Sequence, residues 1–130
     1  MDLLALKQYT KDLTGVYSTD VVSDTLLTRW LNEAYFEVER KATWPWVAVE
    51  LSLGSDTPSF DAQFHSILSY RAAVKVLNFV SDDTNRSETY AGEFALLLGD
   101  MQRYYLSGES TGSYATAGSL VRLVRDLTGV

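Results

Sequence analysis

The sequence predicts a mainly α-helical protein. We expect a small bundle of about four helices, one short β-strand or hairpin between the second and third helices, and a flexible C-terminal arm. Four stretches repeat apolar residues every three or four positions, which places those residues on one helical face. Residues 47–53 instead alternate with a period of two, as a strand does. The sequence therefore divides into a helical domain at residues 1–106 and an arm at residues 107–130.

Length and charge narrow the class of protein. A chain of 130 residues fits a single domain with one modest core. With a formal net charge of −6, the molecule as a whole repels nucleic acid. Cysteine is absent, which excludes disulfides, thiol chemistry and cysteine-bound metal. The first residues do not form a secretory signal, and no apolar run is long enough for a membrane span, so we expect a protein made in the cytoplasm.

The stretch from Ser23 to Trp46 predicts the central helix. Ser23 is a suitable N-cap, and Asp24 follows it in the first turn, where an acid is favourable. Pro45 disfavours helical geometry at Trp44, so we expect the helix to end there. The core face is predicted to contain the apolar residues at helical spacing: Leu27, Trp30, Leu31, Ala34 and Val38.

Two further helices and the strand surround this element. Residues 2–14 predict a first helix that stops at Gly15, a favourable C-terminal residue. The predicted strand, residues 47–53, needs a partner, either a short piece near residues 57–61 or a neighbouring subunit. Residues 64–80 predict a third helix that is apolar on most sides and should form the centre of the core.

Residues 88–106 predict a fourth helix with two different faces. One face is wide and rich in tyrosine and leucine, whereas the other holds Gly92, Ala95 and Gly99. Small residues on one side allow another backbone to approach closely. The favoured interpretation is that the two glycines are simply tolerated at a surface, at a cost of about 1 kcal/mol each relative to alanine.

The composition changes at Ser107. Residues 107–119 are rich in Gly, Ser and Thr, as linkers are. They precede a short amphipathic end whose apolar face would carry Leu120, Leu123, Val124 and Leu127. This pattern is typical of a docking arm. A C-terminal helix that folds back onto its own domain is an equally good interpretation.

No group of residues indicates catalysis, a cofactor or a metal. The single histidine, His65, lacks the paired spacing of a metal site, so a structural role is expected. The acidic loop at residues 82–88 lacks the glycine and the final glutamate of a calcium loop. Glu33 and Glu37 lie among basic residues and predict a face of ion pairs. We therefore expect a protein that is not an enzyme.

Phe36 does not fit the pattern of a monomer. It lies on the polar face of the central helix, at the same side as Asn32, Arg29 and Arg40. An aromatic residue among charges is a candidate contact for another chain. Single exposed apolar residues are also normal. We favour a contact, since the unpaired strand and the arm point to partners as well.

Several of these segments resemble the head–tail adaptor (connector) proteins of tailed bacteriophages. The residues that carry the resemblance are the run Arg29-Trp30-Leu31-Asn32-Glu33-Ala34 and the corner Trp44-Pro45-Trp46. Tyr70-Arg71-Ala72-Ala73 and the Tyr104-Tyr105 ending are similar but less specific. The resemblance covers residues 1–106, and the C-terminal end departs from it.

The resemblance implies a structural virion protein of the neck, assembled in the host cytoplasm. Such adaptors form a ring, commonly of twelve copies, beneath the portal protein. They extend the channel through which DNA passes without sequence-specific binding, and they present the surface to which a tail completion or stopper protein docks. Some reach the portal with a C-terminal segment. The alternative is a soluble helical interaction module, monomeric or dimeric and without catalytic activity.

Overall fold

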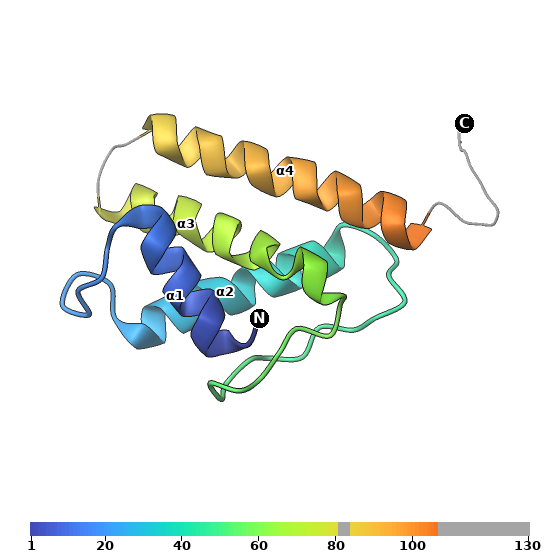
Figure 1. Ribbon diagram of the computed structural model, residues 1–130, viewed down its shortest axis with the longest axis horizontal. Coiled ribbons are helices and arrows are strands. Elements are labelled where there is room, and N and C mark those ends of the chain that lie inside the picture. The colour runs from blue at the N-terminus through green and yellow to red at the C-terminus, as the bar shows by residue number, and fades with distance from the viewer. Residues whose placement is uncertain (81–83, 107–130) are drawn as a thin grey trace. The chain divides into compact units, whose positions relative to one another are not determined.

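The mainly helical prediction is confirmed by the structure, a computed structural model that describes residues 1–80 and 84–106 (Figure 1). The chain divides into two compact units, Met1–Leu98 and Gly99–Val130. The elements in chain order are α1 (Leu3–Thr14), α2 (Asp24–Arg40), the short 3-10 helix η1 (Ala62–Phe64), α3 (Ser66–Val80) and α4 (Thr84–Leu106). The predicted arm lies outside the described residues.

Helix α1 begins and ends at the signals that the sequence carries. The Asp2 side chain accepts a hydrogen bond from the Ala5 amide at 2.8 Å, and Gly15 adopts a left-handed conformation with φ 73°. Only glycine takes that conformation without steric cost. The buried face includes two threonines, Thr10 and Thr14. Their hydroxyls donate to backbone carbonyls one turn earlier, which allows them to be buried.

Helix α2 starts as expected but ends earlier. The Ser23 hydroxyl caps it by accepting from the Leu26 amide at 3.1 Å. The last helical residue is Arg40 and not a residue near Trp44. The Trp44 indole folds back over this end and donates to the Val38 carbonyl at 2.8 Å. The same carbonyl accepts from the Lys41 amide at 3.1 Å, a bond to the third residue back that tightens the last turn.

Aromatic rings fill the corner after α2. Trp44 and Trp46 stack with their centroids 5.4 Å apart, and Trp46 lies 5.9 Å from the ring of Tyr35. Tyr35 is completely buried, and its hydroxyl bonds both the hydroxyl and the amide of Ser59. Trp30, which the sequence placed in the core, is instead half-buried against the exposed Phe79 ring. Tyr35 therefore takes the central role that we expected of Trp30.

Helix α3 forms the centre of the core, as predicted, and packs against both α1 and α2. Its apolar residues face these helices, whereas Arg71 and Lys75 reach acids of α2. Arg71 pairs with Glu37 at 3.0 Å, and Lys75 pairs with Glu33 at 3.3 Å. On the α1 side, the hydrogen bond between the hydroxyls of Tyr9 and Tyr70 is the main cause that raises the pKa of Tyr70 to about 12. The predicted ion-pair face is thus a contact between two helices.

Helix α4 begins at Thr84, four residues before the predicted start at residue 88. In the unit Met1–Leu98 it is attached largely through polar groups. The hydroxyl of Tyr90 donates to the Leu13 carbonyl at 2.6 Å, and the Ser87 hydroxyl donates to Asn78 at 3.0 Å. Phe94 is buried, with the Arg71 guanidinium 5.3 Å from its ring centre.

The predicted strand or hairpin at residues 47–53 is wrong, since no strand occurs within residues 1–80 and 84–106. A single side chain provides the pairing that a neighbouring strand would offer. The Asn32 amide oxygen accepts from the Leu51 amide at 2.7 Å, and its nitrogen donates to the Leu51 carbonyl at 2.9 Å. Asn32 thereby pairs both backbone groups of a residue that is itself buried.

Neighbouring residues hold the rest of this segment. The Glu39 carboxylate accepts from the Ala48 amide at 2.8 Å. The Asp56 carboxylate accepts from the amides of Leu53 and Ser52, and these bonds hold its pKa below the usual range. Backbone carbonyls of the same turn accept from the first amides of α1. The segment is therefore fixed without a β-ladder.

We expect Asn32→Ala to destabilise the protein by about 2–4 kcal/mol. Both backbone groups of Leu51 would lose their partners, at about 1–3 kcal/mol for each buried group. Thr25→Ala, on the exposed side of the same helix, should change stability by no more than about 0.5 kcal/mol. Urea unfolding of the two variants measures the difference. Equal midpoints would contradict the role assigned to Asn32.

Candidate functional site

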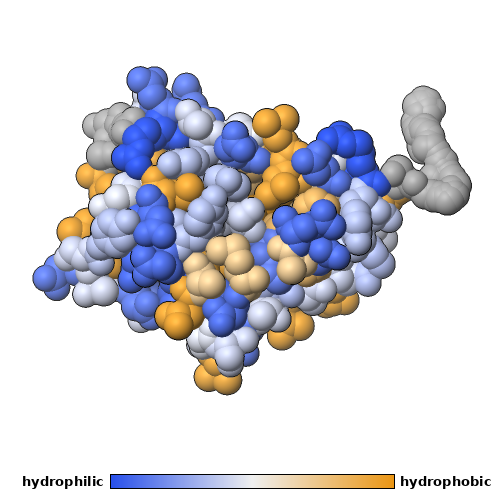
Figure 2. Space-filling model, viewed as in Figure 1, coloured by the Kyte–Doolittle hydropathy of each residue, from blue (hydrophilic) through white to orange (hydrophobic). Residues whose placement is uncertain are grey.

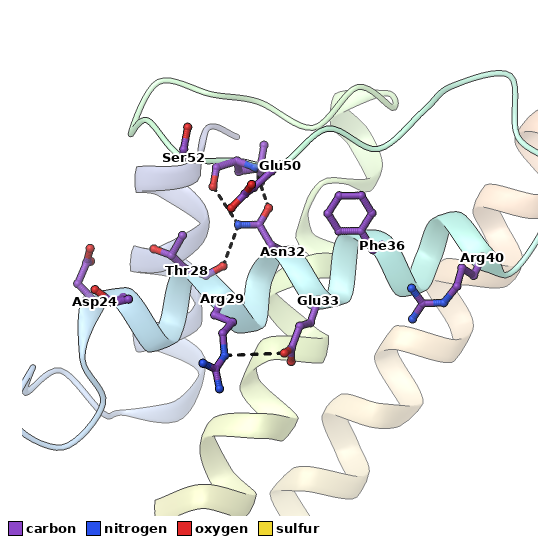
Figure 3. A pocket seen from close by; sticks show the side chains of 11 residues that line it. Asp24, Thr28, Arg29, Asn32, Glu33, Phe36, Arg40, Glu50 and Ser52 are labelled. Carbon is purple, nitrogen blue, oxygen red and sulfur yellow. Dashed lines mark hydrogen bonds and ion pairs between the residues drawn. The ribbon is translucent and has the colours of Figure 1, made fainter.

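A groove of about 780 Å³ lies between α2 and the segment that follows the aromatic corner (Figure 3). One wall is α2, and the other is the segment that Asn32 holds through Leu51. Its lining residues are mostly polar: Asp24, Thr25, Thr28, Arg29, Asn32, Glu33, Phe36, Arg40, Glu50, Leu51 and Ser52. The groove thus carries charges of both signs around two apolar residues, Phe36 and Leu51.

Phe36, the predicted contact residue, lines this groove and is half-buried. Its ring lies 6.0 Å from the buried ring of Tyr35, which supports it from the core side. Figure 3 shows the Phe36 ring pointing to the same side of α2 as Asn32 and the Glu50 segment. The groove therefore offers an apolar floor that is anchored to the core.

The charges of the groove divide into paired and unpaired groups. Glu33 lies 3.9 Å from Arg29 and 3.3 Å from Lys75, so its charge is neutralised within the fold. Arg40 and Glu50 are exposed and make no hydrogen bond or ion pair with the described residues. A cation and an anion thus remain available to a partner.

The segment also carries apolar side chains that do not line the groove. Val47, Val49 and Leu53 are 68%, 66% and 65% exposed. We call these three residues the apolar ridge. The predicted alternation does not set burial here, because the buried positions are Ala48 and Leu51, which are three residues apart, and the two valines face solvent. Figure 2 shows that, on the face in view, apolar residues are dispersed among hydrophilic ones.

The other predicted contact residues are not gathered with Phe36. Gly92 is exposed, with open space around the position of a Cβ, and Ala95 is exposed as well. No other backbone lies close to Gly92, so the interpretation as a glycine tolerated at the surface fits this position. Gly99 lies beside its own helix neighbour Arg103, whose guanidinium is 3.7 Å from the Cβ position. The predicted arm residues, Leu120, Leu123, Val124 and Leu127, lie outside the described residues.

His65 is buried at the junction of η1 and α3. Its Nε2 atom lies 2.8 Å from the Phe60 carbonyl, and its Nδ1 atom lies 2.8 Å from the amino group of Met1. Nε2 donates to the carbonyl and Nδ1 accepts from the amine, which is the pattern of a neutral ring. Burial is the main cause that lowers the pKa of His65, and the neighbouring amino group adds to it.

Other classes of site find no support in the part of the chain that the structure describes. No group of three or more histidines, acids or cysteines there could hold a metal ion. Asn85 and Glu88 of the acidic loop are exposed residues of α4. None of the described helices is long and apolar enough to cross a membrane.

The groove itself was not predicted from the sequence. Asn32 and Arg40 were noted only as polar neighbours of Phe36, and Glu50 lies within the predicted strand at residues 47–53. The available signal was the spacing of Asn32, Phe36 and Arg40, which are four residues apart and share one face of a helix. The second wall of the groove comes from a segment with no such pattern.

Comparison with known proteins gives no further assignment: no family model, no curated protein and no solved structure matches the chain.

The pKa of His65 predicts a loss of stability in mild acid. Because the folded pKa lies below the ordinary 6.5, the unfolded chain binds a proton more readily once the pH falls below that value. The melting temperature should therefore decrease between about pH 7 and about pH 5. The melting temperature of the His65→Gln variant should decrease less over the same pH range, because glutamine cannot be protonated. If the melting temperatures of the two proteins fell in parallel with pH, His65 would not titrate as inferred.

Proposed function

We propose that this protein is a structural assembly component that forms a ring with copies of itself, as the head–tail adaptors of tailed phages do. The observation that carries the proposal is the combination of the groove with the apolar ridge. Burying a valine or leucine side chain contributes about 1.5–3 kcal/mol. Three such side chains held rigidly in solvent favour association with another chain.

The residues of the resemblance support the proposal by their positions. In the run of residues 29–34, Asn32 holds the segment that carries the ridge, and Glu33 joins α2 to α3. Trp44-Pro45-Trp46 forms the stacked corner that starts this segment. The most specific residues of the resemblance thus build the surface that we assign to subunit contact.

In this proposal the ring lies beneath a portal protein and offers its other side to a tail completion or stopper protein. DNA passes through the channel without specific contacts, and a net charge of −6 suits a wall that must not retain phosphate. Residues 107–130 are the candidate segment for reaching the portal. The function needs no catalytic group or cofactor.

Light scattering of the purified protein, alone and with a cognate portal ring, tests this function. We expect the chain to join the portal in a fixed multiple. Phe36→Asp should remain folded by circular dichroism and lose most of this association, because a charge replaces the apolar floor of the groove. Leu96→Asp is the control for placing an acid at an apolar surface position, since Leu96 is 67% exposed on α4 and lies outside the groove and the ridge.

Two outcomes contradict the proposal. A wild-type chain that ignores the portal and stays a monomer or dimer at every concentration would favour the helical interaction module instead. An unchanged portal association of Phe36→Asp would remove the groove from the assembly surface.

A further inference from the structure

We propose that the first part of α4, residues 84–98, is a releasable helix that opens as a unit while α1, α2 and α3 remain folded. The device is a helix held in place by three polar side chains, Arg86, Ser87 and Tyr90, which we call the polar latch. It gives the chain a helix that can leave its place without unfolding the core. This inference does not depend on the proposed function.

Two of the three latch groups share one acceptor. The hydroxyl of Tyr90 and the guanidinium of Arg86 each donate to the Leu13 carbonyl at 2.6 Å, and the Ser87 hydroxyl donates to Asn78 at 3.0 Å. Leu13 lies in the last turn of α1, where a carbonyl lacks a partner within the helix and the helix dipole attracts a cation. Each bond holds α4 only modestly, because water replaces both partners when the helix opens.

Release of α4 would expose little apolar surface. Within this part of the helix only Ser87 and Phe94 are buried, whereas eight of the fifteen residues of α3 are buried. The Phe94 ring has the Arg71 guanidinium 5.3 Å from its centre, and the Tyr90 ring lies 6.1 Å from that of Tyr70. A guanidinium and a phenol are readily hydrated. Because hydrophobic stabilisation grows with the apolar area removed from water, α4 is held less strongly than α3.

The other three helices are joined to one another without α4. Helix α3 packs extensively against α1 and α2, and the first part of α4 makes no helix contact of comparable extent. The Ser69 hydroxyl donates to the Leu6 carbonyl at 2.9 Å, which ties α3 to α1. Arg71 pairs with Glu37 at 3.0 Å and keeps this partner when Phe94 leaves its guanidinium. Parts of a fold that share few buried contacts open separately.

Amide hydrogen exchange of the full chain, followed by NMR at increasing urea concentrations, tests the proposal. We expect the amides of residues 88–98 to share one opening that is roughly tenfold or more as frequent as the opening of residues 67–77 in α3. The shared opening should depend only weakly on urea, because little surface becomes exposed. The amides of α3 should exchange through global unfolding, which depends strongly on urea.

Two matched variants, each of which loses one tyrosine hydroxyl, separate release from global unfolding. Tyr90→Phe removes a latch bond that is absent from both the released and the unfolded state, so exchange should become severalfold faster in residues 88–98 and in α3 alike. Tyr35→Phe removes bonds to Ser59 in the aromatic corner, away from the latch. It should speed exchange in α3 severalfold and leave residues 88–98 unchanged.

Three results would overturn the inference. If Tyr35→Phe sped exchange equally in both segments, α4 would open only when the whole molecule unfolds. If Tyr90→Phe left exchange in residues 88–98 unchanged, the latch would not hold the helix. Amides of residues 88–98 that exchange one by one, without a shared dependence on urea, would show fraying instead of release.

Discussion

The bond pair between Asn32 and Leu51 is the constraint on which the functional surface depends. Both backbone groups of Leu51 are buried, and a buried amide or carbonyl without a partner is costly. Asn32 satisfies both groups from a helix, so the following segment can lie extended without joining a sheet. The second wall of the groove and the exposed position of the valines both follow from this bond pair.

Polar interactions have an unusually large role around α3. The core side of α3 is apolar, yet its contacts with the other helices also include ion pairs and hydrogen bonds from hydroxyl groups. Glu33 and Glu37 face Lys75 and Arg71, and the first part of α4 is attached by Tyr90 and Ser87. Partly exposed ion pairs contribute little to stability. These pairs engage Glu33 and Glu37 and leave the Arg40 guanidinium of the same helix without an ion-pair partner among the described residues.

The aromatic corner links the core to the surface. Tyr35 is buried between Trp46, Phe60 and Phe36, and the last of these forms the floor of the groove. Rings that pack in this way are stiff and bury a large area. A contact that uses Phe36 is therefore supported directly by the core, without an intervening loop.

The sequence alone determined the helical class, the caps at Ser23 and Gly15, and the central position of α3. These features depend on local chemistry and on spacing along one helix, which the sequence displays directly. It also singled out Phe36, since an aromatic residue among charges breaks a helical pattern. The tertiary structure decided where α2 ends and that Tyr35, not Trp30, is buried in the core. It also decided that the Asn32 side chain pairs the backbone of Leu51 where a neighbouring strand was expected. The core position of Tyr35 and the role of Asn32 depend on contacts with residues of later segments, such as Ser59 and Leu51, and the end of α2 depends on where the Trp44 indole folds. No local pattern encodes which partner a side chain will find.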